Sequence, residues 1–174
     1  MNESIRTLME RRSIRKYKKD MPTDEEIRTV IDAGLMAASG KNLQTPIIIC
    51  LKNREIIERL RKINAEIMGL SEDGDPFYGA PMMLIVLADR SQENYIYDGS
   101  LTMGNMMNAA HAIGLGSCWV NRAKEEFEMP EWRGFLKGLG IEGDYEGIGH
   151  LILGYPEKEN PKALKRKEGR VFFA

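Results

Sequence analysis

The apolar run at residues 80–88 limits the fold more than any other feature of the chain. Its central part, Met83-Leu84-Ile85-Val86-Leu87, places apolar side chains on both faces of an extended backbone. A strand without a polar face is stable only where both faces of its sheet are covered. The run is too short to cross a bilayer as a helix. It therefore predicts a buried central strand between two layers.

Further strand-like segments and several helical patterns surround this run. The strand-like segments are residues 47–51, 117–120, 149–154 and 170–174, and the helical patterns are residues 2–10, 24–35, 54–68, 98–113 and 124–139. Strands and helices interleave, but the strands are few and the helices are long. We therefore predict an α+β fold with a mixed central β-sheet flanked by helices on both faces, in a single domain of residues 1–174.

Local signals mark where some of these helices begin. Thr23 and Glu26 have the spacing of a capping box, so a helix is expected to begin after Thr23. The helix at 98–113 consists largely of small and Met side chains, which predicts burial on nearly all sides. Pro130 interrupts the helical pattern at 124–139.

The end of the chain suggests a second copy of the protein. Residues 171–173 are apolar and follow a charged arm with Pro and Gly, at about 156–174. Such a tail is ordered only where it docks on a surface. Together with the apolar helix at 98–113, it predicts a homodimer in which this arm reaches the partner subunit.

Charge and cysteine content exclude several classes of protein. The net charge is −1, which gives no general affinity for nucleic acid or for an anionic membrane. The N-terminus has no apolar stretch typical of a secretory signal. Cys50 and Cys118 lie far apart in apolar segments, which predicts buried thiols in a reducing, cytoplasmic environment.

A basic motif near the N-terminus is the first candidate binding site. Arg11, Arg12, Ser13 and Arg15 place three guanidinium groups and a hydroxyl within five residues. Arginine presents a planar fork of donors that matches phosphate oxygens. A second basic cluster lies at 162–167, so the two together could clamp a phosphate monoester. The alternative is that both are solvated charge runs.

A polar loop is the second candidate. Ser39, Asn42 and Gln44 offer donors and acceptors that suit the edge of a heteroaromatic ring, although an ordinary polar turn has the same composition. The glycines at 114–116 and 147–149 do not complete a dinucleotide-binding motif. No metal-ligand spacing is present, and His150, in an apolar segment, is interpreted as a core residue.

The order of these blocks resembles the nitroreductase family of FMN-dependent oxidoreductases. The blocks are R-R-S-x-R, A-S-G-x-N-x-Q, G-L-G-S-C-W, L-I-L-G-Y-P and the basic C-terminal segment, and they run from about Ile5 to Phe173. The resemblance implies an intertwined homodimer with two FMN sites at its interface. It also implies electron transfer from NAD(P)H to a small flat acceptor, such as a nitroaromatic or a quinone, by a ping-pong mechanism.

The resemblance also implies a set of FMN-binding residues, with no catalytic side chain because the flavin carries the chemistry. The N-terminal motif contacts the phosphate and the ring, the polar loop approaches from the partner subunit, residues 119–122 face the N5 edge, and a C-terminal basic pair binds the phosphate. These residues are Arg11, Arg12, Ser13, Arg15, Ser39, Asn42, Gln44, Trp119, Val120, Asn121, Lys165 and Arg166.

Departures from the family pattern concern the substrate more than the cofactor. Thr45-Pro46-Ile47 follows Gln44, so the aromatic residue of the family's Q-P-W is missing. Residues 73–77 offer Asp and Pro where larger members supply Asn and Lys. Two alternatives remain open: a non-enzymatic flavin-binding or flavin-sensing protein, and a flavin-dependent reductive dehalogenase or oxidase of the same superfamily.

Overall fold

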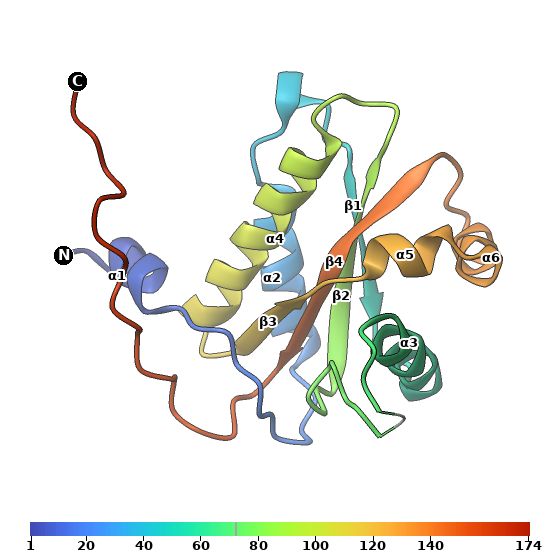
Figure 1. Cartoon of the computed structure of the whole chain (residues 1–174), viewed down its shortest axis with the longest axis horizontal. Coiled ribbons are helices and arrows are strands. Elements are labelled where there is room, and N and C mark those ends of the chain that lie inside the picture. Colours follow the sequence, from blue (N-terminus) through green and yellow to red (C-terminus); the bar gives the residue numbers. More distant parts are fainter. Residues whose placement is uncertain (72) are drawn as a thin grey trace.

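A computed structural model describes residues 1–71 and 73–174. Within them, four strands form one sheet in the order β1-β2-β4-β3 (Figure 1). The strands are β1 (Pro46–Leu51), β2 (Met82–Asp89), β3 (Gly116–Val120) and β4 (Tyr145–Gly154). The three pairings between these strands are antiparallel. A parallel element is present at the β3 edge, where Ser13 forms an isolated bridge to Ser117.

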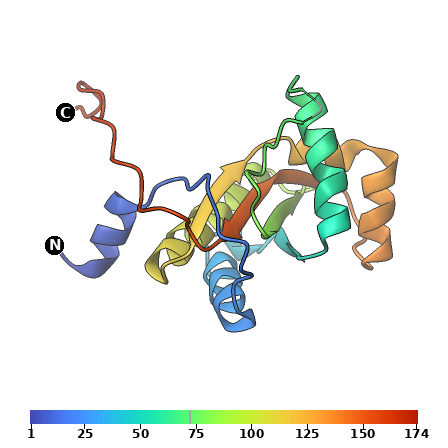
Figure 2. The ribbon, with the colours of Figure 1, turned by 90° about the horizontal axis from the view of Figure 1, so that it is seen from below.

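Helices cover both faces of the sheet, as the sequence predicts. The helices are α1 (Glu3–Glu10), α2 (Asp24–Leu35), α3 (Arg54–Ile67), α4 (Tyr95–Ala112), α5 (Ala123–Glu128) and α6 (Pro130–Gly138), with a short 3-10 turn η1 (Gly40–Asn42). Helices α2 and α4 lie on one face, and α3, α5 and α6 lie on the other (Figure 2). The α+β class with two helical layers is confirmed.

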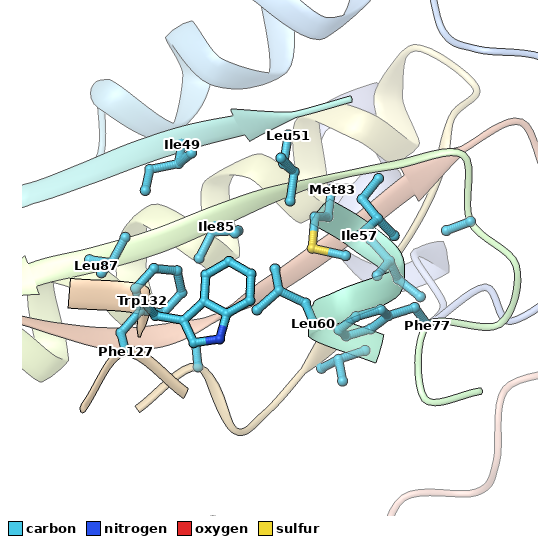
Figure 3. Packing of buried hydrophobic residues seen from close by; sticks show 14 of the residues in the cluster. Ile49, Leu51, Ile57, Leu60, Phe77, Met83, Ile85, Leu87, Phe127 and Trp132 are labelled. Atoms are coloured by element: carbon cyan, nitrogen blue, oxygen red, sulfur yellow. The ribbon is translucent and has the colours of Figure 1, made fainter. Parts of the chain in front are cut away.

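The central strand supplies alternate side chains to two separate cores. All residues of β2 from Met82 to Ala88 are buried. Met83, Ile85 and Leu87 pack with α3, α5 and α6, where Trp132 and Phe127 fill the space over the sheet (Figure 3). Leu84 and the other even-numbered side chains pack against α2 and α4. This alternation follows from the two-residue period of a strand.

Helix boundaries agree with the local sequence signals. Thr23 caps α2, its hydroxyl accepting from the Glu26 backbone while the Glu26 side chain accepts from the Thr23 backbone. Pro130 is the first residue of α6, where its missing N–H leaves no helical hydrogen bond unmade. None of the helices in the described residues has the length and apolar character needed to cross a bilayer.

Several apolar side chains are exposed in the single chain, including some of the helix at 98–113 that was predicted to be buried on nearly all sides. Helix α4 is buried along the side of Met103 and Met106, but its Leu101 is exposed. Helix α1 exposes Leu8, and Phe173 in the C-terminal tail is 96% exposed. No strand forms at 170–174, and the arm extends from the body on the same side as α1 (Figures 1 and 2).

The two cysteines differ in their surroundings. Cys118 is buried in β3, as predicted, whereas Cys50 is exposed. Cys50 lies near the end of the edge strand β1, on the face opposite buried Ile49 and Leu51, where its side chain is exposed. The prediction of a buried thiol at Cys50 is therefore wrong.

Candidate functional site

The basic N-terminal motif lies along the free edge of the sheet. The backbone N–H of Ile14 donates to the Ser117 carbonyl at 2.9 Å, next to the Ser13–Ser117 bridge. The Ile14 side chain covers Gly116 so closely that a Cβ there would lie 2.9 Å from it. Any larger residue at 116 would displace the segment. The Arg11–Arg15 stretch is thus fixed against β3.

Two guanidinium donors in this motif are buried and have no partner. Arg11 Nη1 and Arg12 Nε are inaccessible and make no hydrogen bond. Arg12 Nη1 donates to the backbone carbonyls of Met9 and Arg11, each at 2.7 Å, which fixes the orientation of its guanidinium. Buried donors of a permanently charged group are normally paired. Neither guanidinium group forms an ion pair within the described residues, so an anion such as a phosphate beside the motif would neutralise their charge.

Ser13 is half-buried beside these arginines, whereas Arg15 extends outward. The Arg15 guanidinium carbon lies 5.8 Å from the centroid of the Tyr78 ring, a cation–π contact. Tyr78 itself has a φ of 53°, a left-handed conformation that is uncommon for a residue with a side chain. The loop before β2 thus presents an aromatic ring beside the basic motif.

The end of β3 forms a second part of the candidate site. The indole of Trp119 packs over Gly149 so closely that a Cβ at position 149 would lie 2.3 Å from the indole Nε1. This Nε1 is buried and has no hydrogen-bond partner. Val120 pairs with His150 on β4. Asn121 is exposed and begins the turn into α5. Trp119 and Asn121 line a hollow of about 260 Å³ together with Ser100 of α4.

The polar loop has an unusual backbone. Asn42 and Gln44 both have positive φ, at 55° and 52°. The Gln44 backbone donates to Ser39 Oγ at 3.0 Å, and Gln44 Nε2 donates to Asn42 Oδ1 at 3.3 Å. Ser39, Asn42 and Gln44 thus form one compact group.

This loop and the basic motif lie at opposite ends of α4. Gly40 contacts Asp98 in the first turn of the helix. At the other end, burial and the charge of Arg11 lower the pKa of His111 in the last turn. A rise of 1.5 Å per residue separates Asp98 from His111 by about 20 Å. The two groups of predicted residues therefore lie far apart within one chain.

The C-terminal arm begins beside the basic motif. Pro156 forms a bridge to Tyr17, and the Glu157 N–H donates to the Lys16 carbonyl at 3.1 Å. Farther along, Lys165 and Arg166 are exposed, and Lys165 pairs with Glu168 at 2.7 Å within the arm. The structure thus brings the start of the arm to the basic motif, while the predicted basic pair lies outward.

Other polar residues near the site were not identified from the sequence as site candidates. Asn64, Asp98 and Glu126 are buried, and so is His150, as predicted. For Asn64 the sequence gives one indication: it is a polar residue on an otherwise apolar face of α3, one turn after Leu60. That pattern indicates burial but does not identify the partner.

Together, the antiparallel sheet between two helical layers and the unpaired arginines at its edge define an α+β protein with a candidate anion site. The nitroreductase family model matches residues 8–155. The chain therefore belongs to the nitroreductase family.

Individual relatives agree with this assignment over nearly the whole chain. A nitroreductase of Bacteroides fragilis, crystallised with bound FMN, has a TM-score of 0.88 and 28% identity, covering 100% of both chains. An NADPH-flavin oxidoreductase of Vibrio harveyi is 28% identical and covers 98% of this chain and 72% of its own length. A relative from Archaeoglobus fulgidus, with the provisional name NADH dehydrogenase/NAD(P)H nitroreductase, is 28% identical over 91% of this chain and 88% of its own.

Proposed function

We propose that this chain is an FMN-dependent NAD(P)H oxidoreductase that works as a homodimer. The observation that carries the proposal is the pair of buried, unpartnered N–H groups of Arg11 and Arg12 at the sheet edge. Relatives over the whole chain are crystallised with FMN or named as flavin oxidoreductases. The phosphate of FMN is an anion that would neutralise the charge of these two guanidinium groups.

The phosphate end of the site consists of charged donors. Arg11 and Arg12 supply guanidinium N–H groups, and Ser13 adds a hydroxyl beside them. Charge-assisted bonds of this kind are stronger than neutral ones. Lys165 and Arg166 on the C-terminal arm supply two more cations, and the arm starts next to the basic motif at Tyr17 and Pro156.

The ring end of the site consists of the last residues of β3. Trp119 and Val120 lie within the strand, and the backbone N–H groups of the turn that begins at Asn121 are proposed to contact the ring edge. Backbone donors fixed in advance stabilise negative charge that develops during reduction. Arg15, held beside Tyr78, contacts the ring from the basic motif.

The polar loop acts on the partner's flavin. Ser39, Asn42 and Gln44 lie about 20 Å along α4 from the end where Arg11 lies, and we assign them to the flavin of a second copy. The exposed apolar side chains that a second copy would cover lie on α1, on α4 and in the tail, and they are Ile5, Leu8, Met9, Ile96, Tyr97, Leu101, Val171, Phe172 and Phe173. The arm of about 156–174 is proposed to reach the partner subunit.

The protein's contribution to the reaction is binding and orientation. When bound, FMN supplies two-electron transfer from NAD(P)H to a flat acceptor, a nitroaromatic or a quinone, with donor and acceptor taking the same place in turn. The hollow beside Trp119 and Asn121 is open to solvent, which leaves room for such exchange. No side chain is assigned as a general acid.

The test is the visible spectrum of the purified protein before and after NADH or NADPH is added without oxygen. A flavin spectrum that bleaches with either nucleotide is the expected result. A flavin spectrum that does not bleach would contradict the oxidoreductase activity and favour a flavin-sensing protein. A colourless protein that cannot be loaded with FMN would overturn the proposal altogether.

A further inference from the structure

Three polar side chains are completely buried directly behind the turn at Asn121. Asn64 on α3, Glu126 on α5 and His150 on β4 all have 0% exposure. Asn64 Nδ2 donates to Glu126 Oε1 at 2.6 Å, and His150 Nε2 lies 2.7 Å from Glu126 Oε2. They form a continuous polar cluster across three elements of the fold.

This cluster is connected to the end of β3 by a hydrogen bond to its backbone. The same Asn64 Nδ2 donates to the carbonyl of Asn121 at 2.9 Å. The N–H of Glu126 donates to the carbonyl of Arg122 at 3.1 Å. The Asn121 carbonyl is thus held by the buried Asn64, and the Arg122 carbonyl accepts the first hydrogen bond of α5.

The turn has a conformation that its own sequence does not favour. Arg122 has a φ of 85°, a left-handed conformation normally taken by glycine. A residue with a side chain keeps such a conformation only where its surroundings impose it, and such positions concentrate at functional sites. Asn64 holds the preceding residue Asn121 from the buried side, and the start of α5 holds Arg122 itself.

The cluster also contacts the loop before β2, which carries Phe77 and Tyr78. The His150 ring lies 5.3 Å from the Phe77 ring, and Phe77 is buried. Phe77 directly precedes Tyr78, whose ring receives Arg15. One buried polar group is therefore in contact with both segments that border the proposed ring site.

Stability alone gives little reason for such a cluster. Burying a carboxylate and an imidazole is costly, and apolar side chains of similar volume commonly stabilise a core as well or better. Asn64 Oδ1 and both ring nitrogens of His150 are buried without a hydrogen-bond partner, and so is Glu126 Oε2, which only lies close to His150 Nε2. The arrangement is more readily explained by what it positions than by its own contribution to folding.

We propose that Asn64, Glu126 and His150 are positioning residues that fix the Asn121–Arg122 turn toward the flavin. This inference rests on the proposed function, since it assigns the turn's outer side to the ring edge. The cluster touches no substrate itself. Its effect passes through the backbone of the turn, whose N–H groups it keeps aligned.

The test compares Asn64→Leu with Leu60→Ala in the FMN-loaded protein. Asn64→Leu removes the donor to Asn121 at similar volume, whereas Leu60→Ala leaves a cavity one turn earlier on the same helix, in the same core. We expect Asn64→Leu to make the midpoint potential of bound FMN more negative. Flavin reduction at saturating NADH should slow by about 10- to 100-fold, as for other small displacements of positioning groups.

Leu60→Ala should lower the Tm but leave the potential and the saturating rate unchanged. Equal potentials and rates in Asn64→Leu and the wild type would overturn the inference, while the proposed function would still stand. A wild-type protein that does not bind FMN would instead contradict the proposed function. These two failures are therefore distinguishable.

Glu126→Gln provides a second variant for the case in which Asn64→Leu does not fold. Its amide oxygen can still accept from Asn64, but the contact of the Glu126 carboxylate with His150 is lost. Hydrogen exchange of the peptide containing residues 121–123 should become faster in this variant, with or without FMN. Exchange as slow as in the wild type would contradict the positioning role.

Discussion

Asp98 on α4 and Gly40 in the polar loop are joined by a charge-assisted hydrogen bond of 2.9 Å, in which the Gly40 N–H donates to Oδ1. The other carboxylate oxygen lies 3.4 Å from Thr45 Oγ1. Asp98 is buried, and the loop between Gly40 and Thr45 contains Asn42 and Gln44 with positive φ. The loop therefore takes its shape from α4 rather than from its own residue preferences.

Asp98→Ala should disrupt this loop and weaken FMN binding together with stability. Removing the acceptor leaves a partly buried N–H unpaired, which costs about 1–3 kcal/mol. A chain of this size loses about 2–4 °C in Tm for each kcal/mol. Thermal unfolding and FMN titration measure the two effects. Asp98→Asn keeps an acceptor for Gly40, so its Tm and its FMN affinity should fall less. Unchanged FMN affinity in both variants would refute the role of the loop in binding FMN.

Arg11→Ala should raise the Kd for FMN by about 10- to 150-fold, because a charge-assisted hydrogen bond is worth about 1.5–3 kcal/mol. Quenching of flavin fluorescence during titration measures the Kd. Arg28→Ala is the matched control, since Arg28 is exposed and pairs with Asp32 on the surface of α2. If Arg11→Ala and Arg28→Ala bound FMN equally well, the phosphate would have to bind elsewhere.

Much of the fold follows from local patterns in the sequence. The run at 83–87 has no polar face, so it had to be central, and β2 indeed lies between β1 and β4 with helices on both faces. Thr23 and Pro130 mark helix starts because capping and the missing proline N–H act within one turn. The expected burial of α4 on nearly all sides was wrong for the single chain, since small and Met side chains indicate contact but do not identify its source.

The candidate site was less accessible to sequence reasoning because its supports are distant along the chain. Asn64 and Asn121 are 57 residues apart, and Gly40 and Asp98 are 58 apart. A basic motif indicates an anion site by composition alone. A single buried Asn or Asp has no comparable local signal, since its role depends on the backbone group that tertiary packing brings to it.

Glu26 makes stability depend on pH on the acid side. Hydrogen bonds from Tyr155 and Thr23 hold the pKa of Glu26 below its ordinary value. The Tyr155 hydroxyl donates at 2.6 Å, which joins α2 to the residue after β4, where the arm begins. A carboxyl whose pKa is lowered in the folded state stabilises that state above its ordinary pKa. This contribution is lost as the pH falls through the lowered value.

Glu26→Gln should therefore lower the Tm at neutral pH, and its difference from the wild type should narrow as the pH falls to about 3. Thermal unfolding followed by circular dichroism across this range measures the difference. Glu25→Gln removes a neighbouring charge without breaking these bonds, so it controls for net charge. If the Tm difference between Glu26→Gln and the wild type stayed constant with pH, the lowered pKa of Glu26 would not contribute to stability.

Gly104 offers a direct test of the proposed dimer. It lies on α4 on the same side as exposed Tyr97 and Leu101, and a Cβ at Gly104 meets nothing within 4 Å in the single chain. In an isolated chain, replacing a helical glycine stabilises the helix by about 0.5–1 kcal/mol. In the proposed dimer the same position faces the partner, where a larger side chain would clash.

Gly104→Leu should therefore weaken association and lower the FMN content with it, because the loop of Ser39, Asn42 and Gln44 is proposed to come from the partner. Sedimentation equilibrium and the flavin-to-protein ratio measure the two effects. Gly134→Leu is the matched control, since Gly134 is also helical with open space around its Cβ, but lies on α6, away from α1 and α4. A Gly104→Leu protein that dimerises and retains FMN as Gly134→Leu does would show that α4 does not form the interface.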